Sequence, residues 1–252
     1  MEPLRTDLSI YRKFDFDKPP VGVKFLFFPP KGIERLDRPL AGCEMIQEAQ
    51  NRTSPFYMTK EDESCFARMA LGMIDAPAFA ESGQVGVKYE IFQEARANAR
   101  LYEHIPMFKK GTVNYVVFSP LDAMTFDPDV LLFYAKPHQA EVLLRAMSYS
   151  TGALREAKNT HVLNCAWLLV YPYQSGKVNY TVTGLDFGMI GHHVFSPGYL
   201  LISVPFNWIP TITANLKEMK WVLSPQTDSR EEFIKREEKL VMELIEQSQE
   251  IK

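Results

Sequence analysis

Short runs of branched and aromatic residues alternate along the chain with segments in which apolar positions recur at helical spacing. The run VGVKFLFF at residues 21–28 stands between two proline pairs and predicts a β-strand. Five later runs of similar character predict further strands at residues 85–89, 113–118, 130–134, 178–182 and 200–204. Helical patterns lie between them at residues 91–104, 137–148 and 208–220. Strands and helices therefore interleave along the sequence.

The spacing of these elements favours an α+β fold over a doubly wound α/β fold. The intervals between the predicted strands are irregular, and no glycine-rich phosphate-binding motif follows any of them. We therefore expect a mixed or antiparallel sheet with interleaved helices. The chain has 252 residues, 46% of them hydrophobic, and contains no internal repeat or flexible linker. It is predicted to form a single α+β domain over residues 1–224.

The end of the chain, residues 225–252, has a different character. Its charge density rises, and apolar residues recur there at helical spacing: Phe233, Leu240, Leu244 and Ile251. Asp228 or Ser229 can serve as the N-cap of a helix. This pattern predicts an amphipathic C-terminal helical extension, which either packs on its own domain or joins copies of the chain into a homo-oligomer.

Composition and charge argue against several classes of protein. The chain has 28 Lys and Arg against 31 Asp and Glu, a net charge of −3, which does not suit a general nucleic-acid binder. No window approaches the roughly 20 apolar residues of a membrane span, and the charged first residues do not resemble a signal peptide. Three cysteines, an odd number, argue against a secreted disulfide framework. We therefore expect a cytoplasmic protein with no nucleic-acid or membrane partner.

The cysteines are the main candidates for chemistry. Cys43 and Cys65 open helical patterns, and Cys165, which follows Asn164, opens either a helix that Pro172 ends or a strand. The positive end of a helix dipole lowers the pKa of a thiol in the first turn and favours the thiolate, the form that binds soft metals. Three such sites converging would suit an iron–sulfur cluster with one iron left open. The spacings of 22 and 100 residues match no compact ligand motif, so three unconnected core cysteines are the other interpretation.

Two pairs of polar residues are further candidates for a ligand pocket. Lys60 and Glu61 lie in an acidic segment ahead of Cys65, where acids either cap a helix or handle a proton or a substrate carboxylate. His192 and His193 stand in a glycine-flanked segment. Adjacent side chains of an extended chain point to opposite faces, so at most one of these histidines would enter a given site.

Aromatic residues crowd around the third cysteine. Trp167, Tyr171 and Tyr180 either belong to the core or offer a stacking surface to a flat organic ligand. The chain has no G-x-S-x-G, H-E-x-x-H or Walker motif, which disfavours hydrolase and nucleotidase activities. Whether the protein is an enzyme stays open at this point.

Several blocks of the sequence resemble, in the same order, the family known as domain of unknown function 169, which is common in anaerobic archaea and bacteria. The blocks are RPLAGCEMIQEAQ (38–50), FYMTKEDESCFARMALGM (56–73), FDPDVLLFYAKPHQAEVLLRAMSYSTG (126–152), and the Cys165 segment followed by TVTG. The resemblance extends over residues 19–210 and implies cysteines at the positions of Cys43, Cys65 and Cys165. Many members carry a further cysteine where this chain has Val182 or Thr183.

These features together predict an iron–sulfur protein of anaerobic metabolism. A [4Fe–4S] cluster on Cys43, Cys65 and Cys165 would serve redox or reductive chemistry, with a redox partner protein or a small molecule as its partner. The alternative is a module without cofactor that binds a small aromatic or carboxylated molecule, or a subunit of a larger assembly that docks through the terminal helix.

Overall fold

The computed structural model describes residues 1–250, with the side chain of Glu250 excepted, so the predicted helix position Ile251 lies outside the described residues. The chain forms two compact units, residues 1–217 and 218–252. The first unit contains the sheet and all of the candidate site residues named above. Among the described helices, none combines the length and the apolar character needed to cross a membrane.

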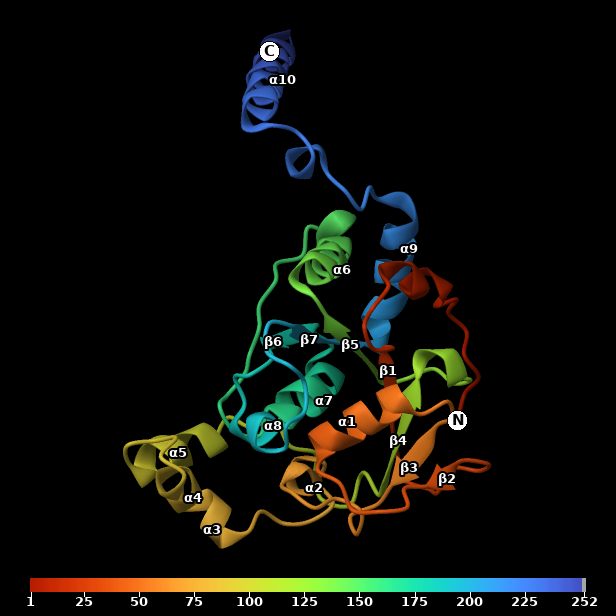
Figure 1. Ribbon diagram of the computed structural model, residues 1–252, viewed down its shortest axis with the longest axis vertical. Coiled ribbons are helices and arrows are strands. Elements are labelled where there is room, and N and C mark those ends of the chain that lie inside the picture. Colours follow the sequence, from red (N-terminus) through yellow and green to blue (C-terminus); the bar gives the residue numbers. More distant parts are fainter. Residues whose placement is uncertain (251–252) are drawn as a thin grey trace. The chain divides into compact units, whose positions relative to one another are not determined.

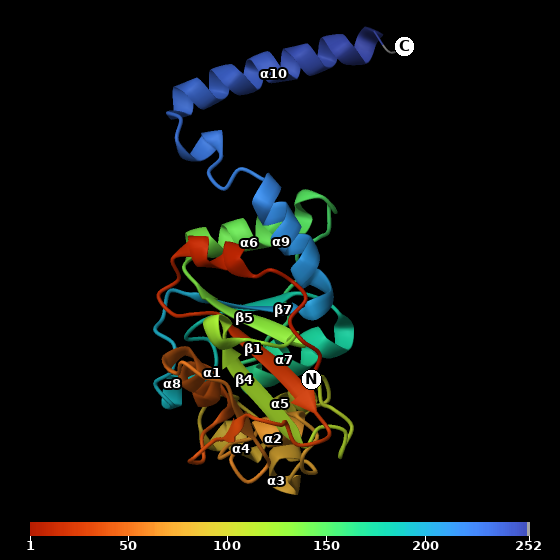
Figure 2. The same cartoon turned by 90° about the vertical axis from the view of Figure 1, so that its right-hand side faces the viewer.

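A mixed sheet of seven strands lies at the centre of the described part of the first unit (Figures 1 and 2). The strands are β1 (Val21–Leu26), β2 (Glu34–Arg35), β3 (Phe56–Met58), β4 (Tyr115–Pro120), β5 (Val130–Ala135), β6 (Asn179–Val182) and β7 (Leu200–Pro205). Their order across the sheet is β2-β3-β4-β1-β5-β7-β6. From β3 across the sheet to the edge strand β6, each strand runs antiparallel to the next. At the other edge, β2 runs parallel to β3. The predicted α+β class with a mixed sheet is therefore confirmed.

Both faces of the central strand β5 are buried. Val130 and Leu132 belong to one face and Leu131 and Phe133 to the other, and none of the four is more than 1% exposed. Alternate side chains of a strand point to opposite faces, so a continuous apolar run is typical of a strand that is covered on both sides. The sequence VLLFYA of β5 has this character.

Helices form a layer on each face of the sheet (Figure 2). One face is covered by α1 (Gly42–Asn51), α2 (Ala67–Ala70) and α7 (Asn164–Ser175), which share a core with Val130 and Leu132. The other is covered by the 3-10 helix η1 (Ser9–Phe14) with α6 (Pro137–Tyr149) and α9 (Ile209–Glu218). The remaining helices of this unit are α3 (Ala78–Glu81), α4 (Gln84–Lys88), α5 (Ala95–Tyr102) and α8 (Phe187–Gly191), and the 3-10 turns η2 (Leu121–Ala123) and η3 (Phe206–Trp208).

The structure corrects the sequence predictions at residues 85–89 and in the Cys165 segment. The strand predicted at residues 85–89 is wrong, because this segment forms α4 and none of the described strands pairs with it. A strand depends on cross-strand partners, whereas a short helix closes its own hydrogen bonds, and Gly83, with φ +74°, starts this helical turn. The Cys165 segment is the helix α7, and Pro172 lies inside that helix instead of ending it.

The second unit contains the 3-10 turn η4 (Ser224–Gln226) and the helix α10 (Arg230–Glu250), which confirms the predicted C-terminal helix. Of the two candidate N-caps, Ser229 is the one used. Its Oγ accepts a hydrogen bond from the N–H of Glu232 (3.3 Å), and Oε2 of Glu232 accepts one from the N–H of Ser229 (2.9 Å). This reciprocal pair is a capping box.

Candidate functional site

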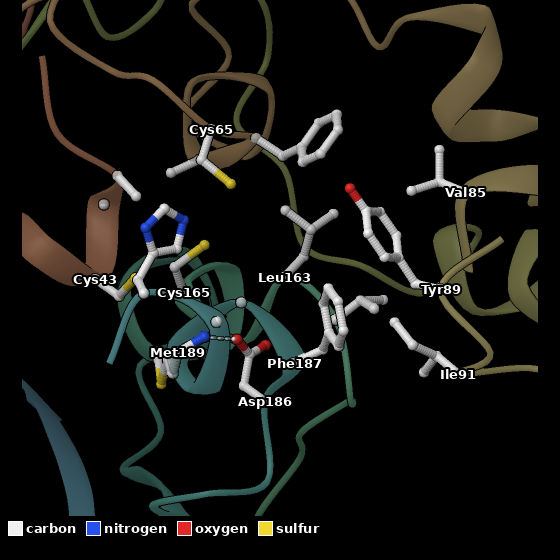
Figure 3. A pocket seen from close by; sticks show the side chains of 18 of the residues that line it. Cys43, Cys65, Val85, Tyr89, Ile91, Leu163, Cys165, Asp186, Phe187 and Met189 are labelled. Carbon is white, nitrogen blue, oxygen red and sulfur yellow. Dashed lines mark hydrogen bonds between the residues drawn. The ribbon is translucent and has the colours of Figure 1, made fainter. Parts of the chain in front are cut away.

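A cavity of about 260 Å³ lies where α1, α2, α7 and α8 meet the helices α4 and α5 (Figure 3). All three cysteines of the chain line it, each as a free thiol. Cys43 comes from the first turn of α1 and Cys165 from the first turn of α7. The prediction that Cys65 opens a helix is wrong, because α2 begins at Ala67 and Cys65 lies in the segment before it. Figure 3 shows the three side chains in one half of the cavity. The fold therefore brings together residues that are 22 and 100 positions apart in the sequence.

A buried carboxylate, Glu63, joins the segments that carry the first two cysteines. The residue is 1% exposed and lines the cavity. Its Oε1 accepts a hydrogen bond from the N–H of Gly42 (3.1 Å), at the start of α1. Its Oε2 accepts from the N–H groups of Cys65 (3.0 Å) and Arg68 (3.3 Å). One side chain thus fixes the N-terminus of the helix that presents Cys43 against the segment that presents Cys65.

A second buried carboxylate, Asp186, holds the wall that carries Cys165. It is 5% exposed, and its Oδ1 caps α8 by accepting from the N–H of Met189 (2.8 Å), the bond drawn in Figure 3. Its Oδ2 accepts from the N–H of Asn164 (3.0 Å), the first residue of α7. Asp186 therefore ties the helix of Cys165 to the short helix that precedes His192.

Burial raises the pKa of the Glu63 and Asp186 carboxyls, and the backbone N–H donors that each side chain accepts act in the opposite direction. Both carboxyls accept several hydrogen bonds from backbone N–H groups, at a place from which water is largely excluded. Their protonation would remove acceptors that the surrounding helix ends need.

The thiols are weak acids in this cavity. Burial raises the pKa of Cys43 from 9.0 to about 12 and that of Cys65 from 9.0 to about 11. It also raises the pKa of Cys165 well above the ordinary value, with the charge of Asp186 acting in the same direction. The predicted lowering by the helix dipole is wrong, because the loss of hydration and the nearby carboxylates outweigh the positive ends of the helices.

His192 lines the same cavity as the cysteines, and its ring is positioned by Glu44. Nδ1 of His192 lies 3.4 Å from Oε1 of Glu44, while Oε2 of Glu44 accepts from the N–H of Ala41 (2.7 Å). A carboxylate beside Nδ1 favours the tautomer that carries its proton there, which leaves the lone pair on Nε2. The pair thus makes Nε2 available as an acceptor or a metal ligand.

Lys60 and Glu61 do not line this cavity. They are exposed and line a separate hollow on the surface together with Thr59. Thr59 donates its hydroxyl to Oε2 of Glu61 (2.7 Å), which lowers the pKa of that carboxyl. In the acidic segment before Cys65, the residue that reaches the cysteine cavity is Glu63.

The other residues predicted for a ligand pocket, namely His193 and the three aromatic residues, do not line the cavity either. His193 is exposed and follows α8. Trp167 and Tyr171 pack against each other on α7 with ring centroids 5.5 Å apart, and Nε1 of Trp167 donates to Oγ1 of Thr160 (3.0 Å). Tyr180 is partly buried in β6. The structure therefore groups the cysteines with His192 and separates them from the predicted aromatic set.

Sequence reasoning missed several residues of the cavity wall. Asp186 had a detectable signal, since it precedes a short apolar segment as an N-cap. Glu63 stood in an acidic segment whose residues could not be told apart. Asn98 and Tyr89 lie on α5 and just after α4, and nothing in their local pattern sets them apart from surface residues.

The resemblance to the family implies a further cysteine at Val182 or Thr183, and this position is separate from the cysteine cavity. Neither Val182 nor Thr183 is among the described residues that line the cavity. Val182 is 54% exposed, whereas Thr183 donates its hydroxyl to the carbonyl of Ser196 (2.7 Å) and accepts from the N–H of Tyr199 (3.0 Å). A cysteine at either position is therefore not needed to complete this cavity.

Comparison with known proteins places the chain in a family. The family's sequence profile, DUF169, described as uncharacterised ArCR, matches residues 9–215. A curated relative, the uncharacterized protein MJ0308 of Methanocaldococcus jannaschii, is 29% identical over 172 residues, which cover 66% of this chain and 73% of the relative. No solved structure matches the chain. The resemblance noted in the sequence is confirmed, and the chain belongs to the domain of unknown function 169 family.

Proposed function

We propose that the protein holds a [4Fe–4S] cluster in the cysteine cavity and serves redox or reductive chemistry. The observation that carries the proposal is the convergence of three free thiols, from three separate segments, on one cavity. Among residues 1–250, no group of three His, Cys, Asp or Glu side chains is arranged to hold a metal ion. Each thiolate of a cubane cluster binds a different iron, so its ligands stand further apart than those of a single ion.

Three cysteines leave one iron of such a cluster without a thiolate, and we assign Nε2 of His192 to it. The support is the contact between Nδ1 of His192 and Glu44, because metal-binding histidines commonly direct their other ring nitrogen to a carboxylate. The cluster, when bound, supplies a one-electron redox centre. Glu63 and Asp186 hold the protein ligands in place through backbone bonds.

The raised thiol pKa values have a consequence for loading of the cavity. The thiols of Cys43 and Cys65 are protonated at neutral pH and must lose their protons when they bind iron. Loading is therefore favoured as pH rises. Free thiols also suit a reducing compartment, so the proposal includes a cytoplasmic location in an anaerobe and a redox partner protein.

The test is the iron and acid-labile sulfide content of protein produced and purified without oxygen. We expect about four iron and four sulfide per chain, with a brown chromophore. Each of Cys43→Ser, Cys65→Ser and Cys165→Ser should lose most of the iron, whereas the control Ser64→Ala, next to Cys65, should keep it. A wild-type protein without iron, or full iron in all three cysteine variants, would contradict the proposal.

The alternative function is a module that binds a small organic molecule without any metal. The aromatic residues predicted for such a pocket, Trp167, Tyr171 and Tyr180, do not line the cysteine cavity. It predicts colourless protein after anaerobic purification. The iron measurement therefore separates the two functions directly.

We also propose that α10 joins two copies of the chain. Large apolar side chains of this helix are 45–54% exposed: Leu240, Val241, Leu244 and Ile245. An apolar stripe at helical spacing is typical of a helix that packs on a partner helix.

Removal of residues 225–252 should convert a dimer to a monomer on gel filtration with light scattering. Leu240→Ser/Leu244→Ser should do the same, because both substitutions place a hydroxyl in the apolar stripe. Lys239→Ser/Glu246→Ser, on the opposite side of the helix, serves as the matched control and should stay dimeric. A truncated chain with the same number of subunits as the full chain would exclude this role of α10.

A further inference from the structure

The cysteine cavity has a second half that is apolar and aromatic. Figure 3 shows Val85, Tyr89 and Ile91 across the cavity from the cysteines, with Leu163 and Phe187 between the two sets. The rings of Tyr89 and Phe187 lie 4.9 Å apart with an interplanar angle of 45°. Aromatic faces of this kind suit a flat molecule, which gains contact area against them.

One polar group in this half lacks a partner. Asn98 lines the cavity and is 1% exposed, and its Nδ2 donates to the carbonyl of Gly83 (3.1 Å). That bond fixes the orientation of the amide, and Oδ1 accepts no hydrogen bond from any described residue. A Cβ at Gly86 would lie 2.5 Å from Nδ2 of Asn98 and would clash with it. The glycine at this position therefore makes room for the Asn98 amide at the cavity wall. A buried carbonyl oxygen without a hydrogen bond is unfavourable, so a ligand or a water would have to supply the donor.

The charges around the cavity limit what the ligand can be. None of the described lining residues is a lysine or an arginine, and the lining includes the acids Glu63 and Asp186. A carboxylate or phosphate would find no counter-charge there and would lose its hydration on entry. An uncharged ligand does not incur that cost.

We propose that this half of the cavity binds an uncharged planar heteroaromatic molecule, which donates an N–H to Oδ1 of Asn98 and packs against Tyr89 and Phe187. The whole cavity, including its cysteine half, has a volume of about 260 Å³, so the ligand is limited to one or two fused rings. This site goes beyond the proposed function, because it needs no cluster to form. With a cluster present, the ligand lies in the same cavity as the redox centre and is a candidate substrate.

The test is calorimetric titration with indole, 1-methylindole, which lacks the N–H, and indole-3-carboxylate, which is an anion. Indole should bind about tenfold more tightly than 1-methylindole, the effect of one hydrogen bond to a buried acceptor. The anion should bind more weakly than indole. Asn98→Leu should abolish the preference for indole over 1-methylindole, and Tyr89→Ala should weaken both. Tyr171→Ala, outside the cavity, should change neither.

Absence of indole binding, equal affinities for indole and 1-methylindole in the wild-type protein, or tighter binding of the anion would overturn the proposal. Should Asn98→Leu fail to fold, the wild-type comparison and Tyr89→Ala still decide, because Tyr89 is 60% exposed and tolerates truncation. The cysteine-to-serine variants separate this site from the cluster: they should lose iron and keep the preference for indole.

Discussion

Replacing Glu63 by Gln should destabilise the first unit by about 3 kcal/mol at neutral pH, because the side chain loses one of two oxygens that accept from buried N–H groups. Glu63 accepts from the N–H of Gly42 through Oε1 and from those of Cys65 and Arg68 through Oε2. An amide group presents an N–H donor at one of these places. At least one backbone donor then faces another donor away from water, and the two cysteine segments lose their common anchor.

The measurement is the urea unfolding midpoint of Glu63→Gln together with its iron content after anaerobic purification. Glu61→Gln is the matched control, since Glu61 is two positions away, its side chain is 59% exposed, and the hydrogen bond described above joins it to the neighbouring Thr59 hydroxyl. The control should stay within about 0.5 kcal/mol of the wild type. Equal midpoints for the two variants would show that the buried carboxylate does not hold the cavity together.

The protein without iron should lose stability steeply above about pH 9, through its thiols. The folded state raises the pKa of Cys43 from 9.0 to about 12 and that of Cys65 to about 11, and it raises that of Cys165 as well. Well below pH 9.0 the thiols are protonated in both states, and their contribution to stability is fully present. As pH rises further, the unfolded chain releases protons that the folded chain retains, so unfolding becomes easier. The free energy of unfolding then falls by about 1.4 kcal/mol per pH unit for each thiol, which is about 4 kcal/mol per pH unit when all three contribute.

The check is the free energy of unfolding of the iron-free chain at pH values on both sides of 9.0, for the wild type and for Cys43→Ser/Cys65→Ser/Cys165→Ser. Burial also raises the pKa of Tyr11 and Tyr134, and no cysteine contributes to either shift, so the triple variant keeps the part of the pH dependence that belongs to these tyrosines. The difference between the two proteins isolates the thiols. Parallel pH dependences would mean that the thiols are not buried in the folded state.

Local pattern predicted most of the strands of this fold but failed near the cavity. The strand β5 was recognisable because both of its faces are buried, which produces a continuous apolar run. Residues 85–89 also carry branched and aromatic residues, interrupted by a glycine and a lysine, yet they form α4. Whether a strand finds a partner depends on the arrangement of the whole chain, which local periodicity does not contain.

For the candidate site, the sequence offered convergence of the three cysteines as one of two interpretations, and it did not predict the raised pKa values of their thiols. The dipole of its own helix is only one of the influences on the pKa of each thiol. The pKa of Cys43 depends more on burial and on Asp186, a residue from a distant segment. Asn98 was not predictable, because its unpartnered oxygen follows from the bond that its amide makes with Gly83. Both properties arise from tertiary contacts.

On the proposed function, the buried carboxylates of Glu63 and Asp186 determine what would remain of the site after damage by oxygen. Glu63 and Asp186 hold the cysteine-bearing helix ends through bonds to the backbone, and none of those bonds uses a thiol side chain. The walls of the cavity therefore keep their shape whether or not the cysteines are engaged. A centre destroyed by oxidation would leave behind a folded chain with its ligands still in position, so repair would require only reduction of the thiols and fresh iron and sulfide, without synthesis of a new protein.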